Sequence, residues 1–262
     1  MAERDPEQAA VKTVAKVLDI LEHLRAVGRP RTVSEISRAT GINISTAHRL
    51  LQTLAHRHYV EQAADTHAYG LGPRLLELGC AYAGSVDMVD AARPRMERLR
   101  DNTGETVHLT ILVERDAVEI CHAAGRQPVS ALRGGPGRRD PAHLVATGKV
   151  LLAALPPGRL DALLKAGPLA GPTRCSITDP DALRRDLERT RGRGYALDEQ
   201  ELVDDVCCVA VPVRDGAGRI AASLGIAIPL ARFKPENISA WVRLLGNAAE
   251  GIASTLTLSP AR

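Results

Sequence analysis

The chain has 262 residues, which is enough for one large domain or two modest ones. Apolar residues make up 45% of it and aromatic residues only 2%, so its core must consist mainly of Leu, Val, Ile and Ala. The net charge of +3 is too small to indicate a nucleic-acid partner unless the positive charge is concentrated in one region.

Cysteine usage and hydropathy argue against further classes of protein. The five cysteines are odd in number and form no C-x-x-C pair, which disfavours a disulfide framework and a zinc ribbon. The N-terminus is acidic and polar, and no stretch approaches the roughly 18 apolar residues of a membrane span. We therefore expect a cytoplasmic protein with no membrane association, no metal site and no cofactor.

The first expected elements are two helices. Apolar positions recur at helical spacing over about residues 9–27. Thr32, followed three residues later by Glu35, predicts a capping box, in which the threonine oxygen accepts a backbone N–H and the glutamate reaches back to the cap. A short helix should begin there and turn at Gly41.

Asn43 is expected to cap a longer helix, which completes a helix-turn-helix over residues 32–51. One side of this helix is apolar, with Ala47, Leu51 and Leu54 at helical spacing. The opposite side carries only groups that donate or accept hydrogen bonds, namely Ser45, Thr46, His48, Arg49, Gln52 and His56.

Positive charge is concentrated around this helix, since five arginines between Arg29 and Tyr59 accompany a single acid, Glu35. Arginine and glutamine can pair with guanine and adenine edges in a major groove, while hydroxyl groups hold phosphates. The alternative is the solvated surface of an ordinary helical hairpin. We expect DNA contacts from Arg31, Ser45, Thr46, His48, Arg49, Gln52 and Arg57.

Two strand-like runs, 59–62 and 68–71, surround a polar turn and predict a β-hairpin wing after the helices. Three helices and a wing form a winged helix-turn-helix, a recurrent DNA-binding unit, which we place over residues 9–72. Residues 73–84 are expected to form a linker helix.

The remainder, residues 85–258, is expected to be an α+β domain with an antiparallel sheet flanked by helices. One helix is expected to run through residues 96–100 to about residue 102, with Pro94 either opening its first turn or kinking it. Further helices are expected from about residue 147, over 180–191 and over 236–256. The expected strands are 106–114, 117–123, 128–133, 206–213 and 220–228.

Signatures of common enzymes fail in this domain, so we expect it not to be an enzyme. Gly148-Lys149 resembles the end of a phosphate-binding loop, but Val150 replaces the required Ser or Thr. Cys207 and Cys208 lie in an apolar strand, where cysteine more often acts as a small hydrophobe than as a nucleophile. The spacing of the histidines, His108, His122 and His143, specifies no metal site.

A binding site remains at the start of the helix near Thr147. Unpaired backbone N–H groups at a helix N-terminus, with a hydroxyl beside them, favour a carboxylate or a phosphate. The alternative is a plain helix start without a ligand.

Several motifs, taken in order, resemble a known family over about residues 11–256. They are STAHRLL at 45–51, YGLG at 69–72, Pro141-x-His143 with ATGKVLLA at 146–153, GYAxD at 194–198 and CVAVPV at 208–213. The sequence resembles transcriptional regulators of the isocitrate lyase regulator (IclR) type. The resemblance implies a GAF-like effector-binding domain with a curved antiparallel sheet, a DNA-bound dimer or dimer of dimers (a homotetramer), and a small organic acid as effector.

The resemblance also implies which residues contact the effector. Two of these positions, Gly225 and Ala227, are often serine in relatives, so we expect more room here and a larger or less polar acid, aromatic or branched. With the helix start included, the expected effector-binding residues are Val129, Leu132, Ala146, Thr147, Gly148, Asp198, Val206, Cys208, Gly225 and Ala227.

Two departures from the family concern the DNA-binding unit. Ile44 stands where a basic residue is common, which is expected to cost one phosphate contact. His58 replaces the usual glycine before Tyr59-Val60, which leaves a less ordinary helix end.

The sequence predicts an effector-gated transcription factor, repressor or activator, that binds a pseudo-palindromic operator as a dimer. Two alternatives stay open. One is a metabolite-binding or enzymatic domain whose winged helix serves a protein partner. The other is a metal or thiol sensor built on Cys207, Cys208 and a histidine.

Overall fold

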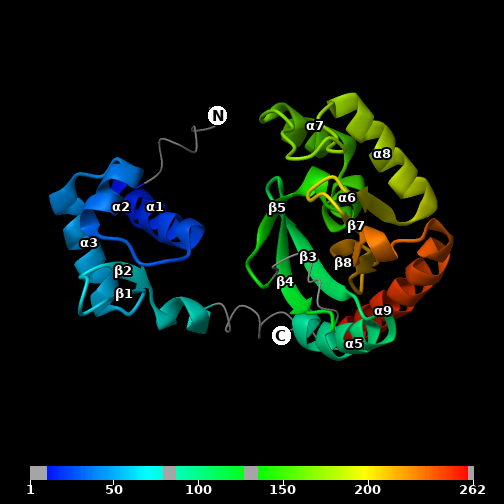
Figure 1. The fold of residues 1–262 in the computed structure, drawn as a ribbon, viewed down its shortest axis with the longest axis horizontal. Coiled ribbons are helices and arrows are strands. Elements are labelled where there is room, and N and C mark those ends of the chain that lie inside the picture. The colour runs from blue at the N-terminus through cyan, green and yellow to red at the C-terminus, as the bar shows by residue number, and fades with distance from the viewer. Residues whose placement is uncertain (1–10, 79–86, 127–134, 259–262) are drawn as a thin grey trace. The chain divides into compact units, whose positions relative to one another are not determined.

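The computed structural model describes residues 11–78, 87–126 and 135–258 (Figure 1). The chain divides into two compact units, Met1–Ser85 and Val86–Arg262. Within the described ranges, no helix combines the length and the apolar composition needed to span a membrane.

The N-terminal unit is a winged helix-turn-helix. Its elements are α1 (Lys12–Val27), α2 (Val33–Thr40), α3 (Ile44–His56), β1 (Val60–Gln62) and β2 (Tyr69–Leu71). The predicted capping box is present, because Thr32 Oγ1 accepts from the N–H of Glu35 and the N–H of Thr32 donates to Glu35 Oε2. Gly41 ends α2 with φ +68°, a left-handed conformation that glycine adopts at low cost.

The core of this unit joins all three helices to the wing. It contains the buried side chains of Ile20, Leu24, Ile36, Leu51 and Tyr69. Strands β1 and β2 pair antiparallel. Reciprocal backbone hydrogen bonds between Arg31 and Tyr69, at 2.9 and 2.7 Å, tie the wing to the segment that enters α2. The wing therefore has a fixed position beside the helix-turn-helix.

The segment after the wing is helical over residues 73–78. The expected linker helix, 73–84, falls partly on residues 79–86, which lie outside the described ranges. Gly72 packs against the backbone of His58, where a Cβ atom would collide with the carbonyl group, so only glycine fits there.

The C-terminal unit is built on a six-stranded antiparallel sheet with the order β5-β4-β3-β8-β7-β6. The expected strand over 128–133 lies outside the described residues. The bounds are β3 (Thr106–Val113), β4 (Asp116–Ala123), β5 (Arg139–Pro141), β6 (Ala196–Glu199), β7 (Val206–Arg214) and β8 (Ile220–Pro229).

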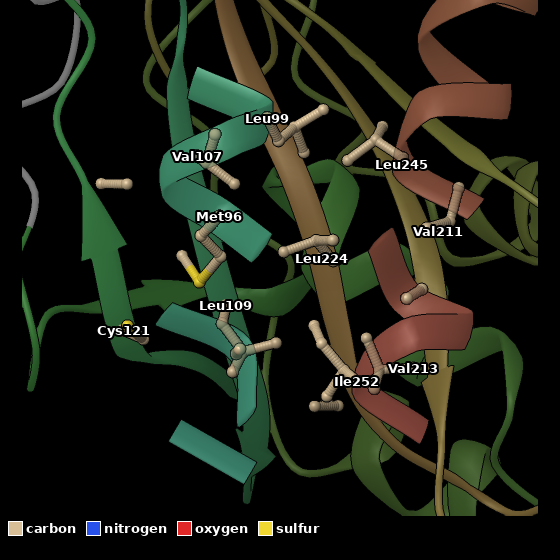
Figure 2. Close-up of a cluster of buried hydrophobic side chains, with 14 of the residues drawn as sticks. Met96, Leu99, Val107, Leu109, Cys121, Val211, Val213, Leu224, Leu245 and Ile252 are labelled. Atoms are coloured by element: carbon tan, nitrogen blue, oxygen red, sulfur yellow. The ribbon is translucent and has the colours of Figure 1, made fainter. Parts of the chain in front are cut away.

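Two long helices, α5 (Asp87–Thr103) and α9 (Ile238–Leu258), pack against one face of this sheet. Figure 2 shows Met96 and Leu99 of α5 and Leu245 of α9 directed toward the sheet residues Leu109 and Leu224. Successive strand residues point to opposite faces, so His108 and Thr110 face away from this core.

Shorter helices cover the other face. They are α6 (Ala146–Ala153), α7 (Pro157–Lys165) and α8 (Pro180–Arg193), with a 3₁₀ turn, η2 (Ala142–Leu144), before α6. Two further 3₁₀ turns, η3 (Leu230–Arg232) and η4 (Pro235–Asn237), connect β8 to α9. The predicted α+β class with an antiparallel sheet is confirmed, whereas β5, β6 and α7 were not among the predicted elements.

Candidate DNA-binding face and effector site

Helix α3 exposes the polar face that the sequence predicted. Ala47, Leu51 and Leu54 are buried against the rest of the unit. On the other side, a groove is lined by Thr13 of α1 and by Thr46, Arg49, Leu50, Gln52, Thr53 and His56 of α3. Three of the predicted DNA-binding residues, Thr46, Arg49 and Gln52, therefore share one surface.

Arg49 is placed at the middle of this surface. It is exposed, and none of the ion pairs found among the described residues engages its guanidinium group. His48 and Gln52 are also exposed, as is Arg57 just beyond the end of α3. No acidic side chain lies on α3, so this face attracts phosphate without internal competition.

Two predicted DNA-binding residues also have internal roles. Arg31 Nη1 pairs with Glu35 Oε1 at 2.9 Å, and its side chain is only 22% exposed. Both the backbone N–H and the hydroxyl group of Ser45 donate to Asn43 Oδ1, at 3.0 and 2.7 Å, and so cap α3. These residues position the helix-turn-helix, whereas Arg49 is exposed and available to a ligand.

The C-terminal unit contains a small cavity, of about 40 Å³, between the sheet and the start of α6. Space of this size holds a few water molecules. Its lining combines apolar with polar and charged residues, and consists of His108, Thr110, Ala117, Glu119, Arg138, Asp140, Val145, Ala146, Thr147, Cys208, Gly225 and Ile226.

The structure brings four of the predicted effector-binding residues to this cavity: Ala146, Thr147, Cys208 and Gly225. Val129 and Leu132 lie outside the described residues. Gly148, Asp198, Val206 and Ala227 do not line the cavity.

Gly148 serves close packing, since a Cβ atom there would collide with the carbonyl oxygen of Ala142. Val206 and Ala227 are buried in an apolar cluster behind the cavity, together with Cys208.

The additional room expected at Gly225 is not found. A Cβ atom at this position would lie 2.8 Å from Thr147 Cγ2 and 3.2 Å from Ala210 Cβ. Helix α6 packs close to β8 here, and the threonine methyl group occupies the space that a larger residue would need. Ala227 likewise contributes to packing. Comparing single positions with the family could not predict this close packing, because α6 and β8 are far apart along the chain.

The charged lining residues Arg138 and Asp140 were not predicted. Arg138 Nε lies 2.9 Å from Asp140 Oδ2, in a partly buried ion pair. Burial raises the pKa of Asp140, an effect that Arg138 partly offsets. In the sequence these residues stand in an RRDP run at 138–141, which matches no binding motif. No side chain caps the start of α6, so this arginine and the first turn of α6 provide positive potential at the cavity.

A buried ion-pair cluster supports α6 from behind. Lys149 is 1% exposed, and its Nζ lies 2.9 Å from Asp186 Oδ2 and 2.6 Å from Glu201 Oε1. The residue that the sequence compared with a phosphate-binding lysine thus joins α6 to α8 and to the loop after β6.

Asp198 belongs to the same region, because its Oδ1 accepts the N–H of Glu201 at 2.7 Å. Burial raises the pKa of this carboxyl group to about 7, with the charge of Glu201 adding to the effect. Asp198 therefore organises the loop that carries Glu201.

The cysteines give no support to a thiol sensor. Burial raises the pKa of Cys207 to about 11 and that of Cys208 still further above its ordinary value. A nucleophilic or metal-binding cysteine requires the opposite shift. His143, the third histidine considered, contacts the carbonyl oxygen of Ala170 through Nε2 at 2.9 Å, and its pKa is lowered by burial.

Comparisons with known proteins agree with these two units. Residues 13–64 match the model of the IclR helix-turn-helix domain, and residues 80–254 match that of the bacterial transcriptional regulator IclR C-terminal domain. The regulator BhcR of Paracoccus denitrificans is 36% identical over 94% of this chain and 88% of its own length. The regulator KdgR of Escherichia coli is 33% identical over 97% of this chain and 96% of its own.

A solved IclR homologue from Microbacterium hydrocarbonoxydans, in complex with 4-hydroxybenzoate, has a similar structure. Its TM-score is 0.84 at 28% identity, and the match covers 94% of this chain and all of that one. The relatives are named as transcriptional regulators, which confirms the predicted class and the expectation that this chain is not an enzyme. The chain belongs to the IclR family of DNA-binding transcriptional regulators.

Proposed function

We propose that this regulator binds a pseudo-palindromic operator as a dimer, or as a dimer of dimers, through α3. The observation that carries the proposal is the acid-free polar face of α3, with Thr46, Arg49 and Gln52 on one surface. Two such helices related by a two-fold axis would enter adjacent major grooves, and the half-site spacing would reflect that axis. Because operator DNA lies in the bacterial cytoplasm, the regulator acts there.

The contacts divide by chemistry. Arg49 and Gln52 have side chains that can read guanine and adenine edges, while Ser45, Thr46 and His48 fit phosphates or nearby bases. Arg57 extends this surface, and Arg31 supports it mainly through Glu35 and the wing. Selection of duplexes from a random pool tests this arrangement. Enrichment of an inverted repeat supports it, whereas enrichment of single unrelated half-sites contradicts the dimeric operator.

The C-terminal unit, we infer, senses a small carboxylic acid at the α6 start. Thr147, the first-turn N–H groups of α6 and Arg138 supply donors and positive potential. Ala146, Cys208 and Gly225 supply apolar contact. An aromatic or branched acid is the proposed ligand, and the complex of the Microbacterium homologue with 4-hydroxybenzoate supports an aromatic one. Since the cavity has space for only a few water molecules, such a ligand requires the lining to open.

An effector acts only through unequal affinity for the DNA-competent and incompetent states. We propose residues 73–84 as the connector that transmits this difference between the units. Calorimetric titration with 4-hydroxybenzoate, a branched acid, glyoxylate and pyruvate tests the ligand class. Tighter binding of glyoxylate or pyruvate than of every larger acid would contradict it. Release or retention of the selected operator then shows whether the effector weakens or strengthens DNA binding.

A further inference from the structure

A β-bulge between β3 and β4 places three polar residues on the same face of the sheet. The pairing runs from His108 opposite His122 to Leu109 opposite Cys121, and then jumps to Thr110 opposite Glu119. One residue of β4, Ile120, is therefore extra, which is the definition of a bulge.

Residues three apart on a regular strand point to opposite faces. The bulge reverses this alternation, so Glu119 and His122 lie on the same face as His108. This is also why the spacing of these residues in the sequence specified nothing, since a bulge is not visible there.

The three side chains converge. His108 Nδ1 lies 2.9 Å from Glu119 Oε2, and His122 Nδ1 lies 2.8 Å from Glu119 Oε1. One possible ligand atom from each residue lies within 4.8 Å of the other two. The three side chains are at most 15% exposed. The cluster is therefore a compact, buried set of two imidazoles and one carboxylate.

This cluster is incompletely satisfied by the protein. One buried atom, His108 Nε2, has no hydrogen-bond partner within the described structure, and the 2.8 Å contact of His122 Nδ1 with Glu119 Oε1 lacks hydrogen-bond geometry. A buried polar atom without a partner costs about 1–3 kcal/mol. His108 and Glu119 also line the cavity, so a small group can reach the cluster from that side.

The donor set selects a class of ligand. Imidazole nitrogen and carboxylate oxygen are the ligands of divalent first-row transition metals, and two histidines with one carboxylate recur in zinc and non-haem iron sites. Tetrahedral ligand atoms at zinc lie about 3.3 Å apart, from bonds of about 2.0–2.1 Å. The present contacts of 2.8 and 2.9 Å are shorter than this separation, so metal binding requires Glu119 and the two histidines to move slightly apart.

We propose that His108, Glu119 and His122 bind one divalent transition-metal ion of the zinc class. Three protein ligands leave a coordination position for water on the side of the cavity. The neighbouring Arg138 is engaged in an ion pair with Asp140, and the carboxylate of Glu119 is the acidic member of the proposed ligand set.

Titration of the tag-free, full-length protein after chelator treatment tests this site. We expect one Zn²⁺ per chain by calorimetry, and one Co²⁺ with the visible absorption of a low-symmetry nitrogen–oxygen site. Glu119→Gln and His122→Gln should each weaken binding by more than ~100-fold, because loss of even an outer-shell partner costs roughly 10- to 100-fold. His143→Gln is the matched control, a buried histidine outside the cluster, and should bind as the parent does.

The change in melting temperature on adding Zn²⁺ provides a second measurement. The parent and His143→Gln should be stabilised, while folded Glu119→Gln should not. Because Glu119→Gln preserves the shape of the side chain, its failure to bind cannot be assigned to a cavity. Absence of saturable binding by the parent, or equal binding by parent and both cluster variants, would overturn the proposal.

Discussion

The buried cluster around Lys149 gives a direct test of how α6 is held. Lys149→Met keeps the apolar stem of the side chain and removes the ammonium group that contacts Asp186 and Glu201. Removing one partner of a buried ion pair costs about 3–5 kcal/mol, because the remaining charge is left without compensation. Asp186 retains a contact with Arg189 at 3.0 Å, so we expect the lower end of this range, about 3 kcal/mol.

Urea denaturation followed by Trp241 fluorescence measures this loss. Trp241 is the only tryptophan and lies on α9, so it reports unfolding of the unit that contains Lys149. The control is Lys165→Met at the exposed end of α7, for which we expect a change within about 0.5 kcal/mol.

The loss in Lys149→Met should shrink as the pH falls toward 5. Burial raises the pKa of Glu201, so this carboxyl group can take up a proton once Lys149 is gone. A loss below about 1 kcal/mol at pH 7.5, or one equal to that of Lys165→Met, would refute the cluster as a support of α6.

Three further predictions follow from backbone, packing and titration. His58 has φ 60°, so His58→Gly should stabilise the N-terminal unit by roughly 0.5–1 kcal/mol, measured by hydrogen exchange of α3. The control His56→Gly, within the helix, should destabilise the unit by about 1 kcal/mol. Stability changes of the same sign in both variants would contradict this. Gly225→Ser should lower the free energy of unfolding in urea by about 1–3 kcal/mol. Adding Thr147→Ser to the same chain should recover part of this loss, because it removes the methyl group that position 225 faces. No recovery would exclude a close contact between positions 147 and 225. Asp198 has a pKa of about 7 in the folded state instead of 3.8, so its contribution to the free energy of unfolding falls as the pH rises between these values. The stability of Asp198→Asn relative to the parent should therefore increase by at most about 4 kcal/mol from pH 4 to 8. A difference that does not change with pH would be inconsistent with that pKa.

Local signals in the sequence were sufficient for the N-terminal unit. The Thr32–Glu35 capping box, Gly41 and the apolar spacing of α3 each act within a few residues, so they could be read without knowledge of the fold. His58 was correctly singled out as an unusual helix end, since it adopts a left-handed conformation with φ 60°, which glycine adopts at lower cost.

Local signals failed where elements were short or contained breakers. β5 has three residues and ends at Pro141, and α7 begins within a Pro-Pro-Gly run that reads as a loop. Neither shows the periodicity on which the assignment of strands and helices depends.

The candidate effector site was only partly predictable because it is assembled from distant segments. Thr147 could be found from the helix start, but its contact with Gly225 depends on how closely α6 packs on β8. The convergence of His108, Glu119 and His122 depends on a bulge. Tertiary packing and strand register decide both features, and neither leaves a local pattern in the sequence.

The most direct test of the account is operator binding by the parent and Arg49→Ala across a salt series. The operator is the duplex recovered by selection, and Arg25→Ala on α1 is the control for loss of one exposed positive charge outside the α3 face. We expect specific binding by the parent with a salt slope of roughly 0.9 per phosphate neutralised. Arg49→Ala should lose roughly 10- to 100-fold in affinity for the operator over unrelated DNA, and Arg25→Ala should keep that ratio. Sequence-independent binding that Arg49→Ala leaves unchanged would contradict the assignment of α3 as the DNA-reading helix.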